Sequence, residues 1–135
     1  MRVFLDANIL FSAAQPKSRL RMLLDLVARH GECLTNAYAV EEARRNLELK
    51  HSSLVVHLAP LVRKLEQVPG LVADLPVKLA TKDVPILGGA IVGRATHLLT
   101  GDQQDFGNYF GKTIRGVKIV TPRMLADELV QQGWL

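Results

Sequence analysis

Hydrophobic and polar positions form short blocks along the chain that predict strands and helices in alternation. The run Arg2–Asp6 is β-branched and aromatic and ends in a carboxylate, which favours a strand, and Asn8–Ala14 then favours a helical turn or two. Between Ser18 and Gly31, leucines and valines recur at helical spacing with charged residues on the other face. The first thirty residues therefore predict a strand followed by helical segments, with Asp6 at the junction.

The same alternation continues through the middle of the chain. Residues 32–35 predict a second strand, and Asn36 is a suitable N-cap for a helical stretch over 37–50. A further helix is predicted from Leu54 to about Glu66, because its apolar residues share one face. Pro69 with Gly70 predicts the end of this helix.

The second half of the chain predicts an irregular segment with one short strand, a helix, two further strands and a terminal helix: Val68–Ala80, Asp83–Arg94, Thr96–Thr100, Val117–Thr121 and the residues from Pro122. A turn, GDQQDF, follows Thr100. Gly88, Gly89 and Gly93 would let the helix that begins at Asp83 lie unusually close to a sheet.

Strands that alternate with amphipathic helices predict the α/β class, with a parallel sheet covered on both faces. The 135 residues, of which 48% are apolar, suit a single domain over 1–135. One cysteine, Cys33, cannot form an internal disulfide, which favours a cytoplasmic protein. The longest uncharged apolar run, between Asp83 and Arg94, is too short to span a membrane, so no membrane association is expected.

Five acidic residues are the strongest chemical signal: Asp6, Glu42, Asp83, Asp102 and Asp105. In parallel α/β sheets, ligands bind beyond the carboxyl ends of the strands, and these acids fall at or near that edge. Each acid alone is explained as a helix cap, a turn former or a solvated side chain. Together they would repel one another unless a multivalent cation neutralised them.

The ligand type narrows the choice of metal and of chemistry. Carboxylate oxygens without paired histidines or thiolates select Mg²⁺ or Mn²⁺ over Zn²⁺. Such ions support in-line hydrolysis of phosphodiesters, which is the leading prediction for the reaction. The net charge of +4 favours a polyanionic partner, and the basic residues predicted to contact an RNA backbone are Arg44, Arg45, Lys50, Lys82 and Arg94.

The segments that carry these acids resemble a PIN domain of the VapC-like kind. The similarity runs through MRVFLDANIL, LTNAYAVEEARRNL, KDVPILGGAI and ATHLLTGDQQDF, and so covers most of the chain. The resemblance implies an α/β/α sandwich with a parallel five-stranded sheet of order 3-2-1-4-5, and a homodimer. It also implies cleavage of single-stranded RNA with Mg²⁺ or Mn²⁺, by the toxin of a toxin–antitoxin pair whose antitoxin would be a cognate partner.

The resemblance assigns roles to individual residues. Catalytic acids and metal ligands would be Asp6, Glu42, Asp83 and Asp102, with Asp105 a further ligand or an assisting residue. Glu41 is the alternative to Glu42 as the second acid. Asn8 and Thr100 would orient Asp6 and Asp102 by hydrogen bonding.

Two other functions use the same residues. The chain could be a non-catalytic PIN-like protein-binding module, in which the acids only position a protein partner. It could also be a phosphoacceptor signalling domain, although the first strand offers Asp6 alone where such domains have an acidic pair.

Overall fold

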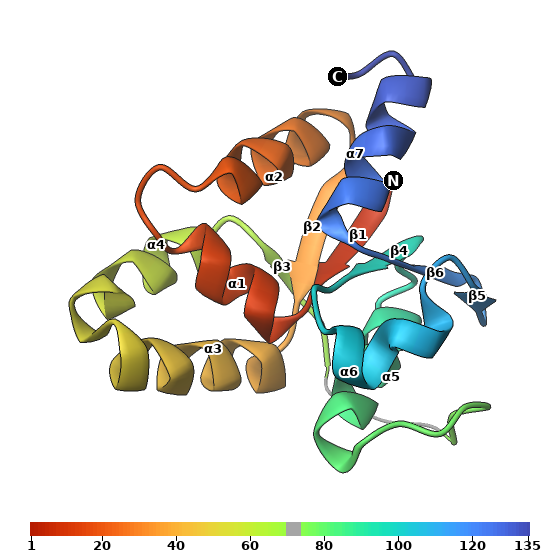
Figure 1. Ribbon diagram of the computed structural model, residues 1–135, viewed down its shortest axis with the longest axis horizontal. Helices are drawn as coiled ribbons and strands as arrows, with labels where there is room; N and C mark the ends of the chain where they lie inside the picture. Colours follow the sequence, from red (N-terminus) through yellow and green to blue (C-terminus); the bar gives the residue numbers. More distant parts are fainter. Residues whose placement is uncertain (70–73) are drawn as a thin grey trace.

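A mixed sheet of six strands runs through the centre of the molecule. The computed structural model describes residues 1–69 and 74–135 (Figure 1). The strands are β1 (Arg2–Leu5), β2 (Glu32–Thr35), β3 (Glu66–Gln67), β4 (His97–Leu99), β5 (Thr113–Ile114) and β6 (Val117–Val120). Their order is β3-β2-β1-β4-β6-β5, and every neighbouring pair is parallel except β5 with β6.

Helices cover both faces of the sheet. They are α1 (Ala7–Ala13), α2 (Arg19–His30), α3 (Ala37–Lys50), α4 (Leu58–Val62), α5 (Val84–Val92), α6 (Gln103–Phe106) and α7 (Pro122–Gln131), with short 3₁₀ turns η1 (Ser52–His57), η2 (Thr81–Asp83) and η3 (Gly107–Tyr109). The chain moves toward one edge of the sheet from β1 to β3 and toward the opposite edge from β3 to β6. Because the crossover connections are right-handed, α1–α4 lie on one face of the sheet and α5 and α6 on the other. Helix α7 packs against α2 and β6, and α5 packs against β1, β2 and β4 (Figure 1).

Local signals in the sequence account for most element boundaries. Asp6 accepts a hydrogen bond from the backbone N–H of Ala7 at the start of α1, whereas Asn36 and Thr121 cap α3 and α7 by accepting from the N–H three residues further on. Pro122 occupies the first turn of α7, where its missing N–H leaves no bond unmade. The strands and helices predicted over the first 50 residues are confirmed.

The predicted sheet is wrong in strand number and in direction. The five-stranded parallel sheet of order 3-2-1-4-5 is replaced by the six-stranded mixed sheet, because β5 adds an antiparallel strand beside β6. The turn between them contains Arg115 and Gly116, both with positive φ, as a two-residue hairpin with primed-turn geometry requires. A strand of two residues is too short to leave a periodic pattern, so the dipeptide Arg115–Gly116 was its one local signal.

The helix predicted over Leu54–Glu66 is also wrong. The chain instead forms η1, then α4, and reaches β3 at Glu66. Pro60 explains the difference, since in the interior of a helix from Leu54 its ring would clash with the preceding turn, whereas it fits the first turn of α4. The predicted stop at Pro69 with Gly70 is not observed, because α4 already ends at Val62, and Gly70 lies outside the described residues.

Glycines bring α5 close to the sheet, as predicted. A Cβ on Gly89 would overlap the side-chain nitrogen of Asn36 and lie 3.1 Å from the Phe4 ring. A Cβ on Gly93 would lie 3.0 Å from Val68. Close packing against β1 and β2 therefore requires Gly89, despite the low helix propensity of glycine.

Asn36 joins the start of α3 to the start of α5. Its Oδ1 accepts from the backbone N–H of Ala39, and its Nδ2 donates to the carbonyl of Pro85, both at 3.0 Å. The side chain is fully buried, so neither bond has water as a substitute. One amide thereby holds two helices on opposite faces of the sheet.

In the part of the chain that the structure describes, none of the helices has the length and apolar composition needed to cross a membrane.

Replacing Gly89 by Ala is expected to destabilise the protein by about 1–3 kcal/mol, because the added methyl group displaces an amide held by two buried hydrogen bonds. Gly107→Ala is the matched control, since a Cβ there meets nothing within 4 Å and the backbone is already helical. Urea denaturation of both variants measures the difference. Equal stability of the two variants would contradict the close packing of α5.

Candidate functional site

The acidic residues gather where the chain reverses its direction across the sheet. The strands β2 and β3 lie on one side of β1, and β4, β6 and β5 lie on its other side. The carboxyl ends of β1 and β4 therefore form the crevice in which α/β proteins bind ligands. Asp6 directly follows β1 and Asp102 follows β4. The backbone N–H of Asp6 donates to the carbonyl of Leu99 at 3.1 Å, which fixes the two strand ends together.

Asp6 is buried and held by three hydrogen bonds. Its Oδ1 accepts from the backbone of Ala7 at 2.6 Å, and its Oδ2 accepts from Thr100 Oγ1 at 2.8 Å and from Asn8 Nδ2 at 3.1 Å. Burial raises the pKa of Asp6 to about 6, although the bonds from Thr100 and Ala7 oppose the rise. The carboxylate is therefore fixed in one orientation.

Asn8 and Thr100 act on Asp6 as the sequence predicted, but reach Asp102 differently. Thr100 Oγ1 accepts from the backbone N–H of Asp102 at 3.1 Å, and Asn8 Oδ1 accepts from the backbone N–H of Gly101 at 2.8 Å. Neither bond is made to the carboxylate of Asp102. Asn8 and Thr100 therefore hold the backbone of the loop after β4, whereas the carboxylate of Asp102 accepts its hydrogen bond from the backbone of α6.

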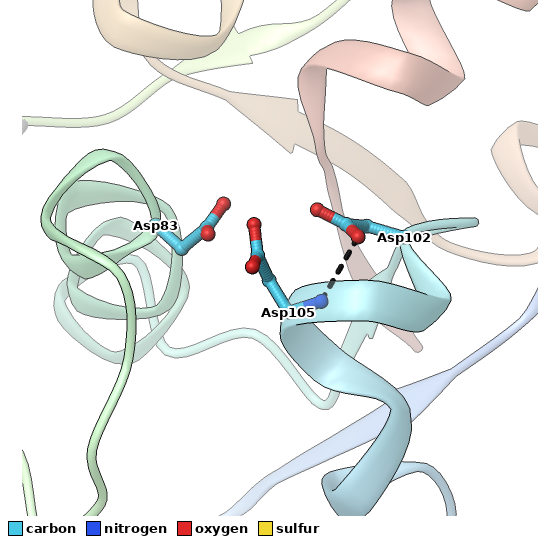
Figure 2. A group of neighbouring side chains, drawn as sticks. All are labelled: Asp83, Asp102 and Asp105. Carbon is cyan, nitrogen blue, oxygen red and sulfur yellow. Dashed lines mark hydrogen bonds between the residues drawn. The ribbon is translucent and has the colours of Figure 1, made fainter.

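Three carboxylates converge beside this loop (Figure 2). Asp83, Asp102 and Asp105 each offer an oxygen within 4.8 Å of the other two. Asp102 caps α6 by accepting from the backbone N–H of Asp105 at 3.0 Å, and Asp83 approaches from the start of α5. Figure 2 shows the carboxylates of Asp83 and Asp105 pointing toward one another. The segment predicted as a turn is thus partly helical, and the helix brings two of the acids together.

Asp83 is the acid of this group that is buried and incompletely hydrogen-bonded. Its side chain is 3% exposed, and its Oδ2 is buried without a hydrogen-bond partner in the described structure. Burial, followed by the adjacent Asp105, raises the pKa of Asp83 to about 8. The proximity of Asp83, together with the charge of Lys82, lowers the pKa of Asp105, so Asp83 is the more readily protonated acid of the two.

A cavity of about 430 Å³ joins the acids. Its lining includes Asp6, Glu42, Asp83 and Asp102, which come from four segments far apart in the sequence. Asp105 contacts this group but is not among the lining residues. The cavity therefore brings together four of the five predicted acids and places the fifth beside them.

Glu42 and Glu41 have different surroundings. Glu42 lines the cavity and its charge contributes to the raised pKa of Asp6. Glu41 is exposed and pairs with Arg44 on the outer face of α3. The geometry favours Glu42 as the acid that α3 contributes.

Five basic residues were predicted to bind RNA. In the part of the chain that the structure describes, Lys82 lines the acidic cavity and the other four do not. Its Nζ lies 3.3 Å from Asp105 Oδ2. Arg44 is instead paired with Glu41 and with Glu48 on its own helix, and Arg45 lies 3.9 Å from Glu41.

The other two basic residues lie away from the acids. Lys50 ends α3, and its ammonium lies 5.7 Å from the centre of the Phe11 ring. Arg94 lies between α5 and β4, and so at the amino edge of the sheet, opposite the acids. Arg94 is therefore separated from the acids by the length of β4, and its contact with an RNA backbone stays a prediction.

Two polar side chains in the cavity lining were not predicted from the sequence. Asn46 lies one helical turn after Glu42 on α3, so the four-residue spacing could have found it. Ser12, near the end of α1, gave no signal, since its position depends on how α1 packs against α2 and α3.

The donor set fits a divalent cation that prefers oxygen ligands. Three carboxylates are within reach of one ion, and one buried oxygen of Asp83 has no partner, which a cation would satisfy. In the described residues this group contains no histidine or cysteine. The acids therefore suit Mg²⁺ or Mn²⁺ better than Zn²⁺.

A cavity of about 840 Å³ adjoins the acidic one. It is mainly apolar and lies between α2 and α7, where Leu23, Leu26 and the exposed Met22 form part of its lining. The two cavities are contiguous, because they share three lining residues: Ser12, Leu20 and Pro122.

Comparison with known proteins finds likeness in structure but not in sequence. No family model matches the chain. No curated protein matches it either. Solved structures do match: VapBC2 from Rickettsia felis, bound to a DNA fragment from its promoter, gives a TM-score of 0.68 at 18% identity over 90% of this chain and 98% of the matched chain.

Two further structures show the same fold. FitAcB from Neisseria gonorrhoeae gives a TM-score of 0.57 at 18% identity, over 90% of this chain and 98% of the other. FitAB bound to an IR36 DNA fragment gives 0.58 at 17% identity, over 89% and 94%. At this level of identity the likeness shows a shared fold.

These comparisons correct the predicted assignment to the VapC-like PIN domain family. No family model matches, and the sheet is not the parallel five-stranded one that the resemblance implied. The motifs that suggested the family, a carboxylate after each of two strands and an acid opening a helix, are short and recur in other α/β proteins. What the comparisons support is a fold shared with chains of the VapBC2 and FitAB complexes.

In metal-free protein, Asp83→Asn is expected to raise the melting temperature more at pH 8.5 than at pH 5. The folded-state pKa of Asp83 is raised to about 8, so the stability linked to its proton is present at low pH and lost as the pH rises through 8. Asparagine stays neutral and avoids this loss, so the advantage of the variant should grow by about 3 °C or more. Thermal unfolding with a chelator present measures it.

Asp127→Asn, at an exposed position on α7, is the control and should show no such growth. A pH-independent effect of Asp83→Asn would mean that Asp83 is ionised throughout this range.

Proposed function

We propose that the protein is a metal-dependent hydrolase of phosphodiester bonds, acting on single-stranded RNA. One observation carries the proposal: the buried, unpartnered oxygen of Asp83 lies beside Asp102 and Asp105, in a cavity that Asp6 and Glu42 also border. Folding such a group without a cation is unfavourable, since the carboxylates repel one another and have lost their hydration.

Each acid has a distinct part in the proposal. Asp83, Asp102 and Asp105 would hold Mg²⁺ or Mn²⁺, which supplies Lewis-acid polarisation of the phosphoryl group and activation of water. Asp6, fixed by Thr100 and Asn8, presents a rigid carboxylate toward the same cavity.

The wall that α3 contributes completes the proposed site. Glu42 is one carboxylate on this wall, and Asn46 offers an amide that can bond to a phosphate or ribose oxygen. Preorganised polar groups of this kind favour the charge distribution of the transition state.

The choice of RNA rests on charge and on size. The net charge of +4 favours a polyanion, and Lys82 places a positive charge at the cavity. The acids line a cavity of about 430 Å³ and not an open flat face, which favours a flexible single strand over a rigid duplex.

We further propose that the protein works as a member of a toxin–antitoxin system. The support is the fold that it shares with chains of the VapBC2 and FitAB complexes. In this setting a cognate protein partner would control access to the acidic cavity. A homodimer remains a prediction.

Purified protein is expected to cut labelled single-stranded RNA with Mg²⁺ or Mn²⁺ and to lose this activity with a chelator. Glu42→Gln should lower the rate by about 100-fold or more, because it removes a carboxylate from the cavity. Glu41→Gln, on the neighbouring exposed position, should cut at the wild-type rate. Gel analysis of the products decides the matter, and equal rates for both variants would point to a contaminating nuclease.

A second candidate is a non-catalytic binding protein, and the apolar cavity between α2 and α7 favours it. An apolar surface that continues into a charged cavity suits a protein segment with apolar and basic side chains. In this function the acids would recognise basic groups of the partner. The two functions differ in whether RNA is cut.

If a partner binds at the apolar cavity, Met22→Glu should weaken its binding at least about tenfold, because a charge would be buried against apolar groups. Met22 is 72% exposed, so the change should leave the fold intact. Leu49→Glu is the matched control, since Leu49 is 83% exposed and lies on α3, away from the cavity lining. Co-expression with the protein encoded beside this one, followed by titration calorimetry, measures the affinity.

A further inference from the structure

Lys82 forms an ion pair with one of the converging acids. Its Nζ lies 3.3 Å from Asp105 Oδ2, and the residue lines the acidic cavity. Of the ion pairs seen in the described residues, the pair of Lys82 with Asp105 is the one that includes Asp83, Asp102 or Asp105. The hydrogen bond to Asp105 raises the pKa of Lys82, and the charges of Asp83 and Asp102 act in the same direction.

The ion pair also bridges the two elements that carry the acids. Lys82 belongs to η2 and directly precedes Asp83, whereas Asp105 belongs to α6. The ammonium therefore joins the segment that presents Asp83 to the helix that presents Asp102 and Asp105. It supplies positive charge between elements whose carboxylates repel one another.

A divalent cation would require the same oxygens. Held by Asp83, Asp102 and Asp105, it would stand within a few ångströms of the ammonium and repel it. The side chain of Lys82 is 60% exposed, so the ammonium can leave toward water without unfolding its surroundings. Lysine and metal thus compete for one carboxylate.

We propose that Lys82 is a tethered counter-cation of the acidic cavity, which pairs with Asp105 until a divalent ion displaces it. This inference rests on the proposed metal site. It assigns Lys82 a role in setting the metal affinity, as a positioning residue for Asp105. Binding of the divalent ion breaks the ion pair of Lys82 with Asp105, which costs free energy. The site therefore binds metal more weakly than its carboxylates alone would.

The test is calorimetric titration of the full chain with MnCl₂, without RNA. Lys82→Met keeps the alkyl stem and removes the charge, and it should bind Mn²⁺ about three- to fivefold more tightly than the wild type. Lys82→Arg restores the charge and should return the affinity to the wild-type value. Lys64→Met, at an exposed position outside the cavity lining, controls for the loss of one surface charge.

A gain in affinity separates this role from a structural one, because a damaged site would bind metal more weakly. Unchanged or weaker binding by Lys82→Met would overturn the inference, and so would an equal gain in Lys64→Met. Asp102→Asn distinguishes the two proposals. Loss of Mn²⁺ binding in that variant with no gain in Lys82→Met overturns the role of Lys82 alone, whereas wild-type binding by Asp102→Asn overturns the metal site and this inference with it.

Discussion

Repulsion between carboxylates in a poorly hydrated cavity is the constraint on which this structure depends. Asp83 loses its hydration through burial and faces Asp105, which raises the pKa of Asp83, and one buried oxygen of Asp83 has no hydrogen-bond partner in the described residues. The hydrogen bonds of helix caps fix two of the acids that border the cavity. Asp6 caps α1, and Asp102 caps α6. Local capping thus holds in place an arrangement that electrostatics opposes.

Much of the fold could be predicted, because its signals are local. The hydrophobic periodicity of α2, the capping residue Asn36 and the proline at the start of α7 act within a few residues of the elements they define. The strand β5 could not be predicted in the same manner, because it depends on pairing with β6. The break before α4 does have a local signal in Pro60, but the apolar periodicity on both sides of the proline concealed it.

The site was predictable in its acids and not in its surroundings. An acid directly after a parallel strand must lie at the carboxyl edge, so Asp6 and Asp102 follow from topology alone. Side chains on long helices are harder to place: Arg44 turned to its neighbours Glu41 and Glu48, while Asn46 turned to the cavity. Family identity was the least predictable part, since short motifs around strand ends recur in unrelated proteins.

The buried amide of Asn36 has a mechanical consequence for the cavity. It fastens the first turn of α3, the helix that carries Glu42 one turn later, to the first turn of α5, which follows Asp83. The side chain of Asn36 therefore links two walls of the cavity from the protein interior, so the width between these walls depends on Asn36 as well as on what occupies the cavity. A substitution at Asn36 would alter that width without touching any acid, and so would change the size of ion or group that the opening accepts.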